Sequence, residues 1–388
     1  AEAAGGVVLV AATVAALVWA NAPWGGTYED FWRTSASLSS GPLSLDLDLR
    51  HWVNDGLMTI FFLVVGIEIK RELVRGELRD PRRAALPAIA ALGGMVVPAL
   101  LYVSVSGGGA RGEGWGIPMA TDIAMAVGVL ALLGRRVHPS LKLFLLALAI
   151  VDDIGAVVVI AVVYSSGVDM AMLGIVALTV VGIVATRRLR VHWLSAYVAL
   201  GAVMWLAFRE AGVHATLAGV VCGLLAPVTP HVAGERVERL EHSLHRLSSF
   251  VIVPLFALAN AGLDLGGGVV RDALGSRVTL AVVFGLVAGK PIGITLASWI
   301  GVRLGLGALP PGVTWRELFG VASIAGIGFT VSLLITELAF DAHALAEEAT
   351  LGVLAASLLS AGLGSLLVVT AARRSPEPEL ARRATQAG

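Results

Sequence analysis

The chain has 388 residues, of which 57% are hydrophobic and only 14% are charged, and its mean hydropathy is +0.84. Soluble domains carry about 25% charged residues, so this composition excludes an ordinary soluble fold and predicts an all-α polytopic membrane protein. A formal net charge of zero argues against a nucleic-acid partner, and the one cysteine, Cys222, excludes a disulfide framework.

Twelve apolar stretches follow one another along the chain, and each is a candidate transmembrane helix. They cover roughly residues 5–21, 52–70, 85–105, 116–134, 142–164, 170–186, 192–208, 212–227, 249–263, 279–301, 318–336 and 348–371. The first stretch ends in Ala20-Asn21-Ala22, which a signal peptidase could cleave. We expect a retained helix instead, because the distribution of charge requires an even number of spans.

The basic residues predict the orientation of these spans. Of the 28 Lys and Arg, 21 lie at alternate ends of the spans, six lie at the other ends, and Lys290 lies within a span. The positive-inside rule places the richer side in the cytoplasm. Both termini are therefore expected in the cytoplasm.

The first outer connection, residues 21–50, contains an alternation of apolar and polar residues. The stretch Leu38-Ser-Ser-Gly-Pro-Leu-Ser-Leu-Asp-Leu-Asp-Leu49 carries a Gly-Pro turn, which predicts a strand or a small β-hairpin outside the membrane. An irregular loop is the alternative. The exposed edge of a hairpin can pair with a second copy of the chain. The tail, residues 373–388, has a composition typical of disorder.

Asp152 and Asp153 are adjacent in the middle of the apolar run Leu143–Val163. One ionised carboxylate at the centre of a bilayer costs about 2.5–3.5 kcal/mol on the lenient insertion scales, so a pair needs a wet cavity, a cation or a basic partner. A structural ion pair is the alternative to a functional site. Neighbouring residues point about 100° apart on a helix, however, and one partner could hardly satisfy both.

Two more charged residues are expected at membrane depth, Asp122 and Lys290. Only three of the 28 basic residues are lysine. A lysine can release its proton when it is desolvated and an arginine cannot, so Lys290 suggests a titrating group or a point charge that faces an aspartate. A chance choice of lysine over arginine is the alternative.

Two spans are expected to be broken. Pro118 and the stretch Ala120-Thr121-Asp122 interrupt one, and Gly326-Ile-Gly-Phe-Thr330 interrupts the other. Unwound backbone at membrane depth is tolerated where it lines a cavity or is buried in protein, and paired broken helices are typical of inverted-repeat transporters. The carboxylate of Asp122 would offset the positive half-helix N-termini, and the ammonium of Lys290 the negative C-termini.

Carboxylate and imidazole groups gather at the expected cytoplasmic boundary. Five of them are candidates for a pH response, because histidine titrates near neutrality: Glu68, Glu72, Glu241, His242 and His245. A solvated charged rim is the alternative interpretation. His214 is interpreted as a packing histidine, and the Gly219-x-x-x-Gly223 and Gly285-x-x-x-Gly289 patterns as helix-packing notches.

Several motifs, in one order over residues 50–370, make the chain resemble the NhaA-type Na+/H+ antiporters. They are Asn54-Asp-Gly-Leu-Met58, Phe61-Phe-Leu-Val-Val-Gly-Ile-Glu-Ile-Lys-Arg-Glu72, Gly93-Gly-Met-Val-Val-Pro98, Ala120-Thr-Asp-Ile-Ala124, Ala147-Leu-Ala-Ile-Val-Asp-Asp-Ile-Gly-Ala156, Gly212-Val-His-Ala-Thr-Leu-Ala-Gly219, Leu255-Phe-Ala-Leu-Ala-Asn-Ala-Gly262, Gly289-Lys-Pro-Ile-Gly293 and Gly326-Ile-Gly-Phe-Thr330. The chain departs from the family after His245, where Pro-Trp is common and Arg246-Leu247 stands here. This departure bears more on the pH-response segment than on the ion site.

The resemblance implies twelve transmembrane helices with two inverted three-helix repeats and two discontinuous, crossing helices. It implies a division into residues 1–84 (the first two helices with the outer hairpin, part of a dimer-facing panel), 85–165 (core repeat one, helices 3–5), 166–265 (panel helices 6–9), 266–372 (core repeat two, helices 10–12) and the cytoplasmic tail 373–388. A homodimer through the hairpin and the panel helices, in the bacterial inner membrane, is expected. The hairpin would lie in the periplasm.

The resemblance also assigns the site. It places the Na+ and proton site on Asp152 and Asp153, supported by Asp122, Thr121 and Lys290. Within the pair it favours Asp152 as the partner of Lys290 and Asp153 as the cation ligand. The pH-response surface falls on the five groups named above.

The expected function is electrogenic, pH-regulated exchange of cytoplasmic Na+ or Li+ for external H+, with no cofactor and no enzymatic activity. Two rival classes fit these residues less well. An intramembrane aspartyl protease needs aspartates on two helices, one in a Gly-x-Gly-Asp motif, whereas Gly326-Ile-Gly328 is followed by Phe329. A sodium-coupled organic-solute symporter gives no reason for the Asp152–Asp153 pair together with Lys290.

Overall fold

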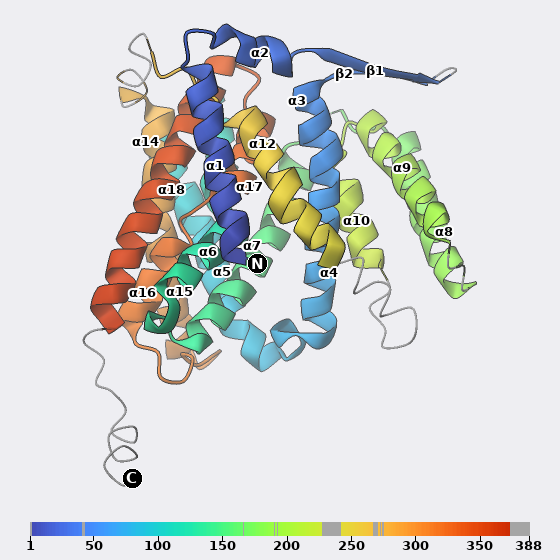
Figure 1. Ribbon diagram of the computed structural model, residues 1–388. Helices are drawn as coiled ribbons and strands as arrows, with labels where there is room; N and C mark the ends of the chain where they lie inside the picture. The colour runs from blue at the N-terminus through green and yellow to red at the C-terminus, as the bar shows by residue number, and fades with distance from the viewer. Residues whose placement is uncertain are drawn as a thin grey trace, which may run out of the picture.

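The apolar stretches of the sequence form helices in the computed structural model, which describes residues 2–40, 43–165, 167–189, 191, 193–226, 242–266, 271, 273 and 275–372. A bilayer core offers no water to backbone N–H and C=O groups, which must therefore bond within their own segment. Most helices lie side by side in one bundle, with α8 and α9 at its edge (Figure 1). Glu241 and the tail, 373–388, lie outside the described residues.

The chain up to residue 165 contains both short surface helices and long apolar ones. They are α1 (Glu2–Ala20), α2 (Gly26–Trp32), α3 (Leu49–His51), α4 (Met58–Arg75), α5 (Pro81–Ser106), α6 (Ile123–Leu133) and α7 (Pro139–Val163), with the π turn η1 (Trp52–Leu57) and the 3-10 segments η2 (Glu77–Arg79), η3 (Gly109–Met119) and η4 (Gly134–Arg136). Asp48, Asp80 and Asp122 cap the N-termini of α3, α5 and α6.

The remaining described helices complete the bundle. They are α8 (Met170–Arg188), α9 (Leu194–Glu210), α10 (Leu217–Leu225), α12 (Val253–Asn260), α14 (Arg277–Phe284), α15 (Lys290–Arg303), α16 (Trp315–Ile324), α17 (Phe329–Ala339) and α18 (His343–Ala372), with the π turns η5 (Ser248–Ile252) and η6 (Gly285–Gly289). Each of these two π turns precedes a proline, Pro254 or Pro291. A proline ring clashes with the carbonyl four residues earlier, and a wider turn accommodates it.

Six described helices are long and apolar enough to cross a membrane, or up to eight if each of two bent pairs counts as one span. The bent pairs are η3 with α6, at 46°, and α16 with α17, at 52°. The prediction of a multi-pass helical membrane protein is confirmed in this form. The count of twelve spans and the inverted repeats stay predictions.

The β-hairpin is confirmed, and it begins earlier than the alternation in the sequence indicates. Strands β1 (Ser35–Ser40) and β2 (Leu43–Asp48) are antiparallel, with Ser35 opposite Asp48, so the first strand starts three residues before Leu38. The indole of Trp52 donates to the carbonyl of Ala36 at 2.9 Å, which fixes the hairpin to η1. The hairpin and α2 lie across one end of the helices (Figure 1).

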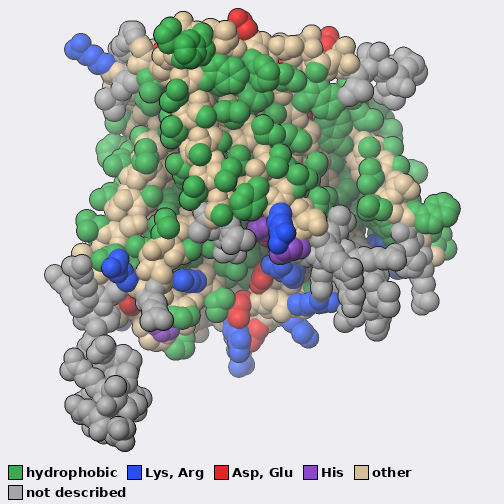
Figure 2. Space-filling model, viewed as in Figure 1, with side chains coloured by type: hydrophobic (Ala, Val, Ile, Leu, Met, Phe, Trp, Pro, Cys, Tyr) green, Lys and Arg blue, Asp and Glu red, His purple; other side chains and the backbone are tan. Residues whose placement is uncertain are grey.

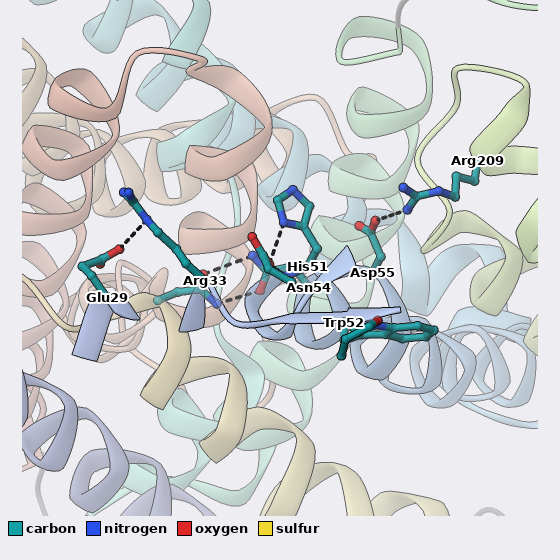
Figure 3. Close-up of polar contacts among 10 residues, drawn as sticks. Glu29, Arg33, His51, Trp52, Asn54, Asp55 and Arg209 are labelled. Atoms are coloured by element: carbon teal, nitrogen blue, oxygen red, sulfur yellow. Dashed lines mark hydrogen bonds and ion pairs between the residues drawn. The ribbon is translucent and has the colours of Figure 1, made fainter. Parts of the chain in front are cut away.

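Polar contacts join the helices at this same end. Arg209 of α9 lies 3.2 Å from the carboxylate of Asp55 in η1, and the two side chains point toward one another in Figure 3. The indole of Trp205, also on α9, donates to the carbonyl of Asp55 at 3.1 Å. These contacts tie α9 to the start of α4. At the opposite end, Lys and Arg gather beneath a broad hydrophobic surface (Figure 2).

Glycines bring two pairs of helices into close contact. Gly293 of α15 packs on the backbone of Gly93 in α5, and Gly223 of α10 packs on Gly66 in α4. A Cβ at any of these four positions would overlap the facing helix. Small residues let membrane helices approach closely enough for backbone packing. The contact between α5 and α15 joins the two predicted core repeats. The contact between α4 and α10 lies within the predicted panel.

Candidate functional site

The two helix breaks meet inside the bundle. The backbone N–H of Asp122, between η3 and α6, donates to the carbonyl of Ile327, between α16 and α17, at 2.6 Å. Thr121 and Asp122 are both almost fully buried, at 1% and 2% exposure. The unwound segments therefore satisfy part of each other's backbone, as membrane depth requires.

Asp122 caps two half-helices at once. Its Oδ1 accepts the N–H of Met125 in α6 at 3.0 Å. Its Oδ2 accepts the N–H of Thr330 in α17 at 3.1 Å and the Thr330 hydroxyl at 2.8 Å. A carboxylate at a helix N-terminus binds unpaired N–H groups and complements the positive end of the helix dipole. Here one carboxylate serves both N-termini.

Lys290 lies at the C-terminus of the half-helix η3, whereas Asp122 lies at helix N-termini. Its Nζ donates to the carbonyl of Met119, the last residue of η3, at 2.5 Å. The same nitrogen lies 2.5 Å from Oδ2 of Asp152, and both side chains are fully buried. Pro291 and the π turn η6 come directly after and before this lysine. The ammonium thus compensates both a carboxylate and the negative end of a half-helix.

The two oxygens of Asp152 have different surroundings. Oδ2 is contacted by the ammonium of Lys290 and by the hydroxyl of Thr121, at 2.7 Å. The Thr121 hydroxyl is also 3.0 Å from the carbonyl of Ala325, and its single proton serves one acceptor at a time. Oδ1 is buried and has no hydrogen-bond partner among the described residues. A buried carboxylate oxygen without a donor is available to a cation or a proton.

Asp153 faces a cavity of about 500 Å³. Thr121, Asp122 and Thr330 line the same cavity, so its inner wall carries the crossing of the broken helices. Lys142 also lines it, eleven residues before Asp153 on α7, which is about 16 Å along the helix. The cavity therefore runs from the middle of α7 toward its basic end.

The pH-response candidates separate in space. Glu68 and His242 line the cavity, and Nε2 of His245 lies 3.6 Å from Oε1 of Glu68. Glu72 instead accepts the N–H of Glu77 at 3.0 Å, in the loop after α4. Glu241 lies outside the described residues. The structure thus brings three of the five groups together at one opening.

Two contributors were missed by reasoning from sequence. Thr330 supplies two of the donors to Asp122, although the partners are 208 residues apart. Thr330 is the second residue of the half-helix α17, where the backbone N–H needs a partner outside the helix. That position was the signal that could have identified it. Arg246, the departure from the family pattern, lines the cavity beside His242 and His245.

Comparisons with known proteins agree along nearly the whole chain. Residues 1–368 match the family model described as Na+/H+ antiporter 1. The Na(+)/H(+) antiporter NhaA of Acidovorax sp. is 51% identical, with 94% of this chain and 89% of the relative covered. NhaA of Rhodospirillum rubrum is 47% identical, covering 97% and 96%. NhaA 3 of Frankia alni is 46% identical, covering 97% and 88%.

Proposed function

The chain belongs to the Na+/H+ antiporter 1 family, and on that premise we propose that it exchanges cytoplasmic Na+ or Li+ for external H+ by alternating access, with cation and protons competing for Asp152 and Asp153. It is a transporter rather than an enzyme. The observation that carries the proposal is the position of the Asp152–Asp153 pair. Asp153 lies on the cavity wall, and the adjacent Asp152 has one buried oxygen without a partner.

Competition follows from the charge of this pair. Two adjacent carboxylates in one buried site repel each other, and the ammonium of Lys290 compensates only the charge of Asp152, so ionisation of Asp153 as well is favoured when a cation joins the pair. A small hard cation prefers oxygen ligands, and carboxylates, the Thr121 hydroxyl and nearby backbone carbonyls are the oxygens at hand. Binding of Na+ would release protons, and return of the protons would expel Na+. Lys290 holds Oδ2 of Asp152 and so leaves Oδ1 for the cation.

Alternating access requires that parts of the molecule move against each other. The close glycine contacts favour two rigid bodies, one containing α5 and α15 and the other α4 and α10. Rocking of the first against the second would expose the crossing to each side in turn. In the proposed exchange, the charges that cross the membrane in the two directions are unequal. The cycle is therefore electrogenic and responds to the membrane potential.

The membrane placement belongs to the same proposal. The basic end of the bundle would face the cytoplasm of a bacterial inner membrane, and both termini would lie there. The cavity would then open to the cytoplasm, with Glu68, His242 and His245 at its entrance as the pH-responsive groups. The hairpin, on the other side, would pair with a second copy in a homodimer.

Proteoliposomes test the proposal directly. We expect Na+ or Li+ pulses to dissipate an imposed ΔpH, measured by fluorescence across pH 6–9, and expect Asp153→Asn and Asp152→Asn each to abolish this recovery. Asp341→Asn, on an exposed residue of the connection before α18, is the matched control and should behave as wild type. Normal exchange by either site variant would end the assignment. A pulse of organic solute that drives Na+ uptake would favour a symporter.

A further inference from the structure

The outer half of the first broken helix has an unusual winding. η3 is a 3-10 helix over eleven residues, Gly109–Met119. Such helices rarely exceed three or four residues, and a longer one marks a hinge or an element held by its neighbours. Something other than local preference must therefore keep η3 in this longer, thinner form.

Two tyrosine hydroxyls hold η3 from either side. Tyr102 of α5 donates to the carbonyl of Arg111 at 2.8 Å. Tyr164, the residue that follows α7, donates to the carbonyl of Glu113 at 2.8 Å and accepts the N–H of Gly116 at 3.2 Å. A Cβ at Gly116 would lie 2.7 Å from the Tyr164 hydroxyl, so a glycine is needed for this approach. Each continuous helix of the first predicted repeat thus holds one point of η3.

With its 3-10 winding, the segment that contains η3 is about as long as the part of the chain that it faces, from Asp152 in α7 to Tyr164. Asp152 and Tyr164 are twelve residues apart, which is about 18 Å at the rise of an α-helix. The facing segment runs from Glu113, bonded to Tyr164, to Thr121, bonded to Asp152. Six 3-10 residues cover about 12 Å, and the two extended residues that follow cover about 7 Å. An α-helical η3 would be about 3 Å shorter and would match the spacing of the two contacts less well.

The inner end of η3 is where this length matters. Met119 ends η3 and offers its carbonyl to Lys290, which also holds Asp152. A retreat of η3 by about 3 Å exceeds the tolerance of a hydrogen bond. The ammonium would then lose one acceptor and turn toward the free oxygen of Asp152, the same oxygen that the proposed cation needs.

We infer that Tyr164, assisted by Tyr102, is a positioning residue for the ion site: its hydroxyl keeps η3 extended so that the carbonyl of Met119 holds Lys290 away from the free oxygen of Asp152. This inference rests on the proposed antiport only for its link to Na+. The contact between Tyr164 and η3 does not depend on the proposed antiport.

Tyr164→Phe tests the inference, and Tyr28→Phe is its matched control. Tyr28 of α2 makes the same pair of backbone bonds, donating to Leu258 at 2.8 Å and accepting from Gly262 at 3.1 Å, away from η3. We expect Tyr164→Phe to raise the KM for Na+ about 3- to 10-fold, the range that one lost hydrogen bond produces. The rate at saturating Na+ should stay within about twofold. Tyr28→Phe should leave KM unchanged.

A second readout does not depend on transport. Hydrogen exchange of residues 109–119, measured in detergent micelles, should be faster in Tyr164→Phe than in wild type and in Tyr28→Phe. If Tyr164→Phe fails to fold, Tyr102→Phe removes the other hydroxyl and carries the same expectation.

Three outcomes overturn the inference: an unchanged KM, an equal rise of KM in Tyr28→Phe, or unchanged exchange of residues 109–119. If wild-type liposomes exchange no ions, the proposed function fails on its own. Unchanged hydrogen exchange would then still overturn the role of Tyr164, and faster exchange would support it.

Discussion

The ammonium of Lys290 lies 2.5 Å from Oδ2 of Asp152, and neither side chain has any exposed surface. Removal of one partner of a buried ion pair leaves the other charge uncompensated, which costs about 3–5 kcal/mol. Lys290→Met should therefore lower the free energy of unfolding by about this amount. The double variant Lys290→Met/Asp152→Asn should recover most of it, because both charges are then gone.

Thermal unfolding in detergent micelles measures both variants. Lys142→Met, on a lysine of the cavity wall, is the control and should change stability by no more than about 0.5 kcal/mol. A double variant as unstable as Lys290→Met alone would show that packing, and not charge, causes the loss.

Asp122 caps α6 and α17 together, so its replacement should affect two helices. We expect Asp122→Ala to cost about 2 kcal/mol or more, since each lost cap costs about 1 kcal/mol, and to slow Na+-dependent ΔpH recovery. Asp169 caps only α8, accepting from Ala171 and Met172. Asp169→Ala should cost about 1 kcal/mol and leave transport unchanged. Equal losses of stability in the two variants would contradict the double cap.

The glycine contacts predict opposite effects at two helix positions. A Cβ at Gly219 would overlap the carbonyl of Thr59, whereas a Cβ at Gly174 in α8 meets nothing within 4 Å. Gly219→Ala should lower stability by about 1–3 kcal/mol through overpacking. Gly174→Ala should raise it by about 0.5–1 kcal/mol, because alanine loses less conformational freedom in a helix. Melting temperatures of the two variants check this, and a stable Gly219→Ala would argue against tight packing of α4 on α10.

Asp48 at the end of the hairpin predicts a pH dependence outside the membrane. Burial raises the pKa of its carboxyl, but hydrogen bonds from the N–H and imidazole of His51, with the charges of His51 and Arg50, hold it below its usual range. A lowered carboxyl pKa stabilises the fold above the unfolded pKa of about 3.9, and this contribution is lost as pH falls through the lower folded value.

Asp48→Asn should accordingly be less stable than wild type at neutral pH, by about 1 kcal/mol for the lost charged cap. The gap should persist down to about pH 4 and close as pH falls further, through the lower folded value. Melting curves of both proteins over that range measure it. Asp46→Asn, on an exposed residue of the same strand, is the control. A gap that stays open at the lowest pH would contradict the argument.

The central site could be predicted in large part because buried charge is expensive. Asp152, Asp153, Asp122 and Lys290 stand out in apolar runs, and the structure places all four around one crossing. Glu68 and Glu72 could not be separated from sequence, since residues four apart share a helix face. Their partners distinguish them: Glu68 lines the cavity beside His245, and Glu72 accepts the N–H of Glu77.

Other features depend on partners that are distant in sequence. The 3-10 segment η3 is held by the hydroxyls of Tyr102 and Tyr164, and no local propensity indicates these contacts. The first strand of the hairpin begins at Ser35 because its residues pair with β2, although Ser35 and Ser37 show little strand preference. The number of spans is also hard to predict, because broken helices interrupt the apolar pattern of the sequence.

The double cap at Asp122 has a consequence for synthesis of the protein. Thr330 leaves the ribosome 208 residues after Asp122, which corresponds to about 10–40 s at ordinary elongation rates. During that interval two of the three donors to the Asp122 carboxylate do not yet exist. The nascent chain therefore needs water or the insertion machinery beside Asp122 until α17 arrives, and the final closure of the crossing is a late, post-insertion step.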